Sequence, residues 1–223
     1  MHAMDNWALK QKGSEEAVVG TWPVVTIARE LGDQGLALGR SVAQRLGFSY
    51  WDRELVMARA RLLTADTTTS SMLDGRTRGA MESLLGTSVP DQIVMSAIYA
   101  DQVRLIVRAI APRGGAVIVG PGAHSLLDRH NTLRVRLVAP FELRARDLGT
   151  REGISFAAAK RFILSDDEMH AWFMLHAFGQ GVADPAHFDV VVNTETYEGE
   201  RAAGLVLMAY LAKFGAWPPT VAL

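Results

Sequence analysis

The chain has 223 residues, of which 49% are hydrophobic and 21% charged, and its formal net charge is -1. This length and composition predict a globular domain with a substantial core. The numbers of basic and acidic residues, 23 and 24, nearly cancel. This excludes a strong positive electrostatic field that would attract nucleic acid or anionic lipid. Because there is no cysteine, disulfides, thiolate metal sites and a cysteine nucleophile are excluded as well.

The first 22 residues are polar, and we expect them to form an N-terminal arm ahead of a single domain over 23–223. The arm lacks the apolar segment of a secretory signal. No apolar run approaches the length of about 18 residues that suggests a membrane span. We therefore expect a cytoplasmic protein, a monomer or homodimer, without membrane or nucleic-acid partners.

Short runs rich in β-branched or aromatic residues alternate with helical patterns along the chain. Strands are expected at 24–28, 48–51, 116–120, 133–139 and 188–193. Helices are expected at 36–47, which ends on Gly47, at 89–111, at 153–164 with Ser155 as N-cap, and at 198–215. This alternation predicts an α/β fold, a parallel five-stranded sheet flanked by helices.

Two segments interrupt the alternation, because residues 60–112 and 140–182 contain no predicted strand. We interpret them as two helical insertions into a core made of 23–59, 113–139 and 183–215. The helix at 89–111 has a broad apolar face of six residues, which indicates a core contact more than a dimer interface: Ile93, Val94, Ala97, Ile98, Leu105 and Ile106.

The stretch "TIARELGDQGLALGRS" at 26–41 joins the first strand to the first helix through a glycine turn. Backbone N–H groups converge at such a turn, and the helix dipole adds about half a positive charge. Gly32 and Gly35 allow the backbone to approach an anion closely. No lysine and hydroxyl residue follow Gly35, so this is not a Walker A loop. The alternative is a tight turn without a ligand.

Five motifs, in order between residues 23 and 212, resemble those of the cytidylate kinase-like family. The turn resembles its "Arg-Glu, aromatic, Gly-x-Gly-Gly" pattern, and the next motif its "Tyr-Asp-Arg-Glu-Leu" element with Trp51 inserted. The other three are "AVIVGPGAHSLL", "VAPFELRARDLGTREGIS" and "DPAHFDVVVNTE". The matching residues of the first two motifs are Arg29, Glu30, Gly32, Gly35, Tyr50, Asp52, Arg53, Glu54 and Leu55.

This resemblance implies a nucleoside monophosphate kinase-like P-loop fold. Its monophosphate-binding insertion would correspond to 60–112 and its lid to 140–182, with a last lid helix around "DDEMHAWF". The implied reaction is phosphoryl transfer from ATP, with Mg²⁺, to a nucleoside monophosphate or a similar small acceptor.

The sequence departs from the family pattern at three positively charged places, which makes the phosphate loop degenerate. Leu36 and Ala37 stand where the family often has arginine and glutamate. Pro121 replaces the arginine of a Gly-Arg-Gly turn. In the last lid helix, Met169 or His170 replaces an arginine, depending on the register. Each lost charge weakens stabilisation of the transferring phosphate, so atypical or weak activity is expected.

Five residues are expected to carry the remaining chemistry: Arg29, Arg40, Asp52, Arg144 and Arg146. Their alternative roles are structural. Arg40, Arg144, Arg146 and also Arg151 would then lie on solvated helix faces, and Asp52 would cap the helix that begins near Arg53.

The predicted nucleotide- and phosphate-binding residues comprise the turn and positions near the other motifs: Gly32, Asp33, Gln34, Gly35, Leu36, Ala37, Arg53, Gly120, Gly122, Arg151, His170, Asn193 and Thr194. Asn193 and Thr194 could equally end a strand, and His170 could be a surface histidine. No protein metal site is predicted; Mg²⁺ would be held by ATP oxygens, Asp52 and water.

Three hypotheses remain open on these residues. The first is an ATP-dependent kinase with a rearranged site. The second is a catalytically degenerate kinase-fold protein that acts as a nucleotide- or anion-binding, or regulatory, module. The third is a structural or oligomeric role without a nucleotide.

Overall fold

A computed structural model describes residues 22–56, 91–120, 122–181 and 184–218, with no side-chain detail for 91–99. It confirms the predicted parallel five-stranded sheet, whose strand order is β2-β3-β1-β4-β5. Most predicted strand bounds shift by one or two residues. The strands are β1 (Val24–Ala28), β2 (Ser49–Trp51), β3 (Ala116–Val119), β4 (Thr132–Val138) and β5 (Val190–Asn193).

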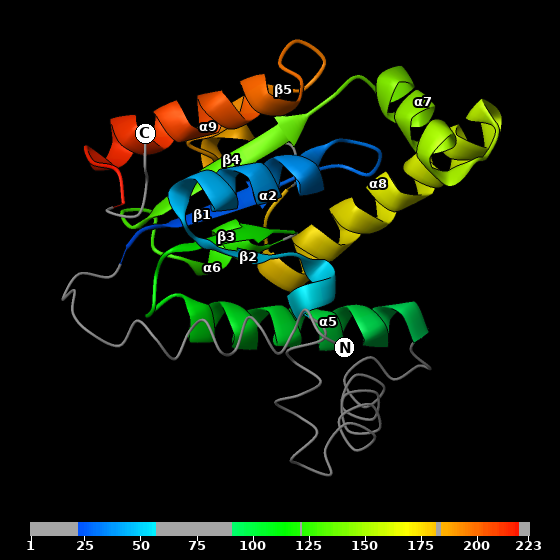
Figure 1. Cartoon of the computed structure of the whole chain (residues 1–223). Coiled ribbons are helices and arrows are strands. Elements are labelled where there is room, and N and C mark those ends of the chain that lie inside the picture. The colour runs from blue at the N-terminus through cyan, green and yellow to red at the C-terminus, as the bar shows by residue number, and fades with distance from the viewer. Residues whose placement is uncertain (1–21, 57–90, 121, 182–183, 219–223) are drawn as a thin grey trace, which may run out of the picture.

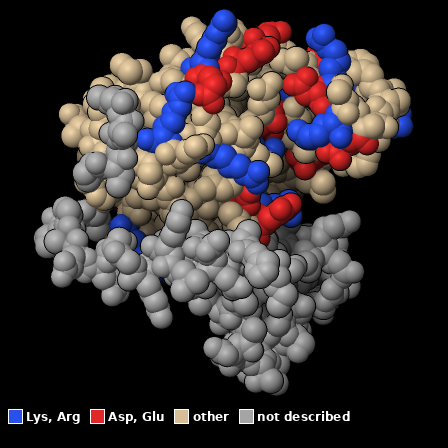
Figure 2. Space-filling model, in the orientation of Figure 1, with Lys and Arg blue, Asp and Glu red and all other residues tan. Residues whose placement is uncertain are grey.

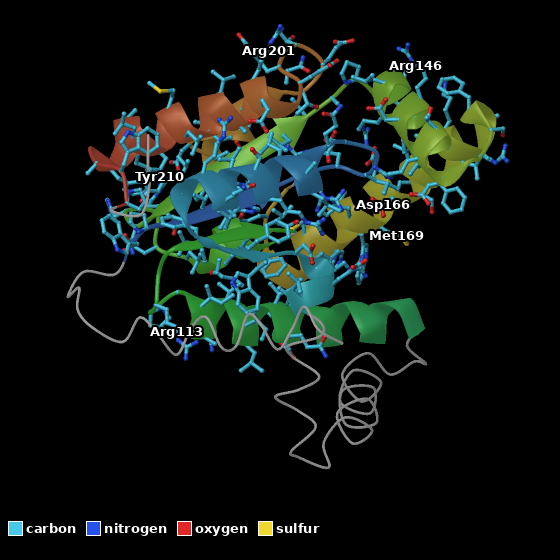
Figure 3. The ribbon with its side chains drawn as sticks, viewed as in Figure 1. Arg113, Arg146, Asp166, Met169, Arg201 and Tyr210 are labelled. Atoms are coloured by element: carbon cyan, nitrogen blue, oxygen red, sulfur yellow. The ribbon has the colours of Figure 1, made fainter. Side chains whose placement is uncertain are left out.

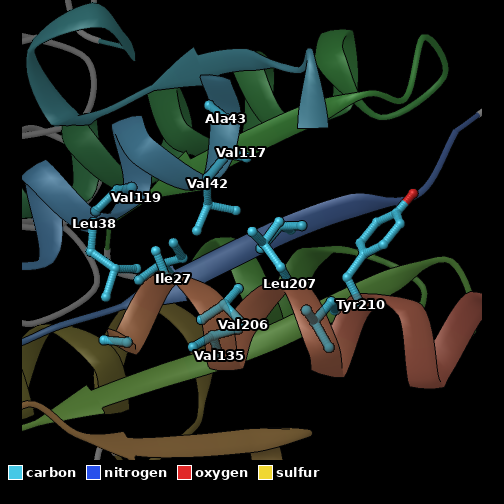
Figure 4. Close-up of a cluster of buried hydrophobic side chains, with 14 of the residues drawn as sticks. Ile27, Leu38, Val42, Ala43, Val117, Val119, Val135, Val206, Leu207 and Tyr210 are labelled. Carbon is cyan, nitrogen blue, oxygen red and sulfur yellow. The ribbon is translucent and has the colours of Figure 1, made fainter. Parts of the chain in front are cut away.

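Helices cover both faces of the sheet (Figure 1). On one face lie α2 (Gly35–Leu46) and α9 (Gly199–Phe214), and on the other α5 (Asp91–Ile110) and the short α6 (Ala123–Leu126). Figure 4 shows the apolar cluster between α2, α9 and the sheet, with Val42, Val135, Val206 and Tyr210 in its interior. Gly47 caps α2 in the left-handed conformation, as predicted.

Strand β4 has two different faces because side chains alternate along a strand. Leu133, Val135 and Leu137 are buried in the apolar cluster with α2 and α9. Arg134 and Arg136 therefore lie on the opposite face, where both are also buried. The central strand β1 is fully buried, as expected for a strand covered on both sides. The carboxyl ends of β1 and β4 lie side by side, since Ala28 pairs with Arg136.

Helix α5 buries one side against the sheet through Val103, Ile106, Val107 and Ile110. The predicted apolar face was wrong at Leu105, whose residue surface is 46% exposed. A helical repeat of 3.6 residues aligns 103, 106, 107 and 110, and Leu105 points elsewhere. The side chains of residues 93–98 lie outside the described part. No described helix combines the length and apolarity needed to cross a bilayer.

The segment predicted as the lid holds α7 (Phe141–Glu152) and α8 (Phe156–Phe178). Ser155 caps α8, as predicted, and its Oγ accepts the Ala158 N–H at 3.2 Å. The helix predicted at 153–164 and the last lid helix are one continuous helix of 23 residues. Its last two turns pack on α5 through Phe173 and Met174, so this insertion also contacts the core. A 3-10 turn, η2 (Pro185–His187), precedes β5.

Candidate functional site

The glycine turn lies at the carboxyl end of β1, and its centre is filled by the carboxylate of Asp33. The Asp33 side chain is fully buried. Its Oδ2 accepts the Glu30 N–H and its Oδ1 accepts the Gly35 N–H, both at 2.9 Å. The Arg29 guanidinium lies 3.8 Å from Oδ1. Burial raises the pKa of Asp33, although Arg29 and the two N–H groups oppose that shift.

Close packing explains both predicted glycines of the turn. Gly32 has a φ of +92°, and a Cβ there would lie 2.6 Å from the Arg144 carbonyl oxygen. A Cβ on Gly35 would lie 2.7 Å from the Arg29 side chain. Leu36 and Ala37 follow in the first turn of α2, where backbone N–H groups have no acceptor within the helix. Backbone N–H groups thus remain at the start of α2, although Asp33 uses that of Gly35.

A network of charges joins the turn to β4, α7 and α8. The Glu30 carboxylate lies 2.7 Å from Arg136 Nη2 and 3.4 Å from Arg144 Nε. Arg144 also donates to both oxygens of Asp167, at 3.0 and 2.8 Å, and to the Leu31 carbonyl at 3.3 Å. Burial raises the pKa of Glu30, while the charges of Arg144 and Arg136 oppose the shift. The solvated-face alternative is therefore wrong for Arg144.

Arg136 is a site residue that the sequence analysis missed. Its signal was present in "TLRVRLV", where two arginines alternate with apolar residues in one strand. A strand covered on both sides has no place for a charged side chain unless that charge is paired. Arg136 meets this condition because its position at the carboxyl end of β4 places it against Glu30.

A second cluster forms where β2 ends, around Asp52. Its Oδ1 accepts the Leu55 N–H at 3.0 Å, which confirms the capping alternative, and its Oδ2 lies 3.5 Å from Arg40. The Arg40 guanidinium lies 5.2 Å from the centre of the Tyr50 ring, and its side chain is 66% exposed. Burial and the Asp52 charge raise the pKa of Tyr50 to about 12. Arg53 lies in the capped helical turn.

The predicted residues at the ends of β3 and β5 have structural contacts. Asn193 Oδ1 accepts the Glu195 N–H at 3.0 Å, and the Thr194 N–H and hydroxyl both donate to the Val138 carbonyl. These contacts match the strand-ending alternative. The Gly120 N–H donates to the Ile27 carbonyl at 3.1 Å, and a Cβ on Gly122 would overlap the Phe178 ring. Pro121 lies outside the described residues.

The sequence of this chain matches that of a known protein family. The sequence model of the cytidylate kinase-like family matches residues 24–196, which is most of the chain. The chain belongs to the cytidylate kinase-like family. The cytidylate kinase of Ignicoccus hospitalis is 36% identical over 84 residues, a match that covers 38% of this chain. The match spans 49%, about half, of that relative's length.

Two solved structures share the fold of this cytidylate kinase-like chain. An uncharacterized protein from Eubacterium ventriosum aligns with a TM-score of 0.63 at 17% identity, over 86% of this chain and 99% of that one. TT1252 from Thermus thermophilus aligns with a TM-score of 0.51, also at 17% identity, over 85% and 98%. At such low identity the likeness extends to the fold alone.

Two neighbouring residues of α8 in the segment predicted as the lid, Met169 and His170, differ in exposure. Met169 points outward and is 56% exposed. His170 is partly buried, between a fully exposed and an enclosed position. Burial lowers the pKa of His170, Asp166 opposes the shift, and Arg136 adds to it. Asp166 and Met169 are labelled on α8 in Figure 3.

Two predicted lid arginines are not brought to the turn. Arg146 is exposed at the outer rim of α7 (Figure 3) and donates to the Glu142 carbonyl of its own helix. Arg151 forms a surface pair with Glu152 at 3.1 Å. Both follow the solvated-face alternative. Figure 2 shows basic and acidic side chains mixed over the described part of one face, without a large patch of one sign.

The family implies that ATP and Mg²⁺ are bound. The described residues suit the phosphate groups of ATP better than they suit a metal ion. The N–H groups of Leu36 and Ala37, at the start of α2, suit phosphate oxygens. No group of three His, Asp or Glu side chains in the described ranges is placed to hold a metal ion. The Asp52 carboxylate already accepts the Leu55 N–H and pairs with Arg40. A cation would therefore be held mainly by phosphate oxygens.

Proposed function

We propose that this protein transfers a phosphoryl group from ATP to a nucleoside monophosphate or a similar small acceptor, at a low rate. The observation that supports it best is the pair of buried arginines beside the turn. Arg136 and Arg144 both contact the carboxylate of Glu30. They place positive charge near the turn from β4 and α7, where Leu36 and Ala37 supply none.

Each group has a role in the proposed transfer. ATP brings the phosphoryl group, and Mg²⁺ on its oxygens neutralises part of their charge. The N–H groups of Leu36 and Ala37 bind phosphate oxygens at the start of α2. Arg136 and Arg144 stabilise the charge on the transferring group, and the carboxylate of Glu30 fixes both guanidinium groups in position. His170, on α8, adds little charge at neutral pH, because burial and the charge of Arg136 lower its pKa.

The same geometry predicts slow turnover. Arg144 makes two hydrogen bonds with Asp167, and Arg136 is bonded to Glu30. Each arginine must give up or share a carboxylate before it contacts phosphate, and a buried charge that loses its partner is costly. Removing a single donor to a transition-state oxyanion costs about 3 to 4 kcal/mol. The proposed site therefore has its charges nearby but already paired.

The alternative function is a nucleotide- or anion-binding, or regulatory, module without turnover. One specific observation favours it, the Asp33 carboxylate at the centre of the turn. A negative charge there opposes the approach of a triphosphate. No acceptor would then be phosphorylated, and the fold would serve binding alone.

A phosphotransfer assay with ATP, Mg²⁺ and each common nucleoside monophosphate tests the proposal. Arg136→Met should reduce turnover at least tenfold, because it removes the charge on β4 that contacts Glu30. Arg134→Met is the matched control. It removes a buried arginine from the same face of the same strand, and Arg134 pairs with Asp189 instead. Thermal melts of both variants monitor folding.

The outcomes separate the functions. Turnover that depends on Arg136 and not on Arg134 supports the kinase. Binding of ATP in a calorimeter, without turnover on any acceptor, supports the binding module. Absence of binding and turnover with every nucleotide contradicts both, and leaves the structural role.

A further inference from the structure

Asp33 occupies the place in the turn where an anion would bind, and it does so as an anion of its own. Its two carboxylate oxygens take the N–H groups of Glu30 and Gly35, each at 2.9 Å. The side chain has no exposed surface. Arg29, the first residue of the turn, lies 3.8 Å away and faces the same carboxylate. The loop therefore directs two N–H donors and a guanidinium at an acidic side chain of the chain itself.

A phosphate group would compete for these partners. Like the carboxylate, it is negatively charged and its oxygens accept hydrogen bonds, and anions bind at the start of a helix through such N–H groups. A carboxylate and a phosphate within about 4 Å of each other repel strongly in a poorly solvated site. Full engagement of the Gly35 N–H by phosphate thus requires the Asp33 carboxylate to leave.

We propose that Asp33 is a built-in competitor of phosphate, an autoinhibitory contact that an incoming polyphosphate must displace. This inference rests on the proposed function, since it concerns the regulation of the same site. The side chain of Arg29 is partly exposed. Gln34, which follows Asp33, makes no side-chain cap to α2. The released N–H groups and Arg29 then become available to the ligand.

Titration with inorganic tripolyphosphate and with ATP, each followed by calorimetry, tests the proposal. Asp33→Asn removes the charge and keeps one oxygen acceptor, and Asp33→Ser removes both the charge and the reach of the side chain. Both variants should bind tripolyphosphate at least tenfold more tightly than the wild-type protein. Thermal melts and circular dichroism establish that the variants are folded.

Asp128→Asn is the matched control. Asp128 also accepts a backbone N–H in a turn, that of His130 at 3.0 Å, but its turn precedes β4, at the amino ends of β1 and β4, whereas the glycine turn follows the carboxyl end of β1. The substitution changes the net charge by the same amount. It should leave the affinity within twofold of wild type, so that a gain seen only at Asp33 is local.

Each result has one meaning. A gain in both Asp33 variants and not in Asp128→Asn supports the competitor. Equal or weaker binding in folded Asp33 variants overturns it, and identifies Asp33 as an organiser of the turn. An equal gain in Asp128→Asn also overturns it, in favour of net charge. If no protein in the set binds either probe, the proposed function itself fails.

Discussion

The two faces of β4 show how this molecule separates stability from charge. One face places Leu133, Val135 and Leu137 in the apolar cluster with α2 and α9. The other places Arg134 and Arg136 in ion pairs with Asp189 and Glu30. The apolar face contributes burial that is insensitive to pH and ligands. The charged face contributes groups whose partners can be exchanged, and it reaches the glycine turn through Glu30.

The largest expected effect lies on the charged side. Arg144→Met should lower the free energy of unfolding by about 4 kcal/mol, because removing one partner of a buried ion pair leaves the others uncompensated. Denaturant unfolding of the purified protein measures it. Arg146→Met, two residues along the same helix and exposed, should stay within about 0.5 kcal/mol of wild type. Equal losses in both would contradict the buried network.

The apolar side should respond almost as strongly. Leu137→Ala should cost about 3 kcal/mol of unfolding free energy, because Leu137 is fully buried and its truncation leaves a cavity. Leu175→Ala removes the same atoms from an exposed position on α8 and should cost little. Denaturant curves at two pH values also test the comparison. The Leu137 effect should not depend on pH, and a strong pH dependence would argue against a purely apolar role.

A pH-dependent loss of stability should come from the charged side through His124. This buried histidine lies 4.6 Å from the Phe188 ring, between centroids. Burial, with the charges of His187 and Arg134, lowers its pKa from 6.5 to about 4. The unfolded chain therefore takes up a proton at higher pH than the folded chain. Stability is complete above pH 6.5 and falls as the pH drops towards 4, by up to about 3 kcal/mol.

His124→Gln tests this assignment because glutamine does not titrate. The loss of unfolding free energy between pH 7 and pH 4 should be smaller in this variant than in wild type. His170, whose pKa is also lowered, titrates in both proteins and cancels in the difference. Identical pH profiles for the two proteins would rule out His124 as the source.

The smallest effect concerns His170, a partly buried residue of α8. His170→Arg should strengthen tripolyphosphate binding two- to fivefold, because it adds a permanent charge close to Arg29 and Arg136. Met169→Arg adds the same charge at an exposed position and should change affinity less than twofold. Calorimetric titrations measure both. A larger gain from Met169→Arg would show that the other register of the lid pattern is the functional one.

Local patterns were enough to predict most elements and some of the contacts that end them. Strand runs, the Gly47 cap and the Ser155 cap are set by neighbours in the chain, so they could be identified without tertiary contacts. The capping role of Asp52 was foreseen for the same reason. The length of α8 was not, because its second half is stabilised by packing on α5, which no local pattern reports.

The candidate site residues fall into two groups, those buried in ion pairs and those exposed to solvent. Arg144 and Arg146 are equivalent in the sequence, two positions apart, yet one joins the buried network and the other is exposed. A helix turns about 100° per residue, and only the placement of α7 against the turn determines which of the two is inward. Arg136 escaped notice because its partner, Glu30, is 106 residues away in the chain.

The sequence by itself determined the parallel sheet, the glycine turn after the first strand and the absence of a Walker lysine. These depend on side-chain periodicity and on residue types, which are properties of the chain alone. Tertiary structure decided that Asp33 fills the turn and that Arg136 and Arg144 meet at Glu30. The reason is physical: a charge can be buried only where a partner is brought to it, and that partner comes from a distant segment or from the fold of the loop itself.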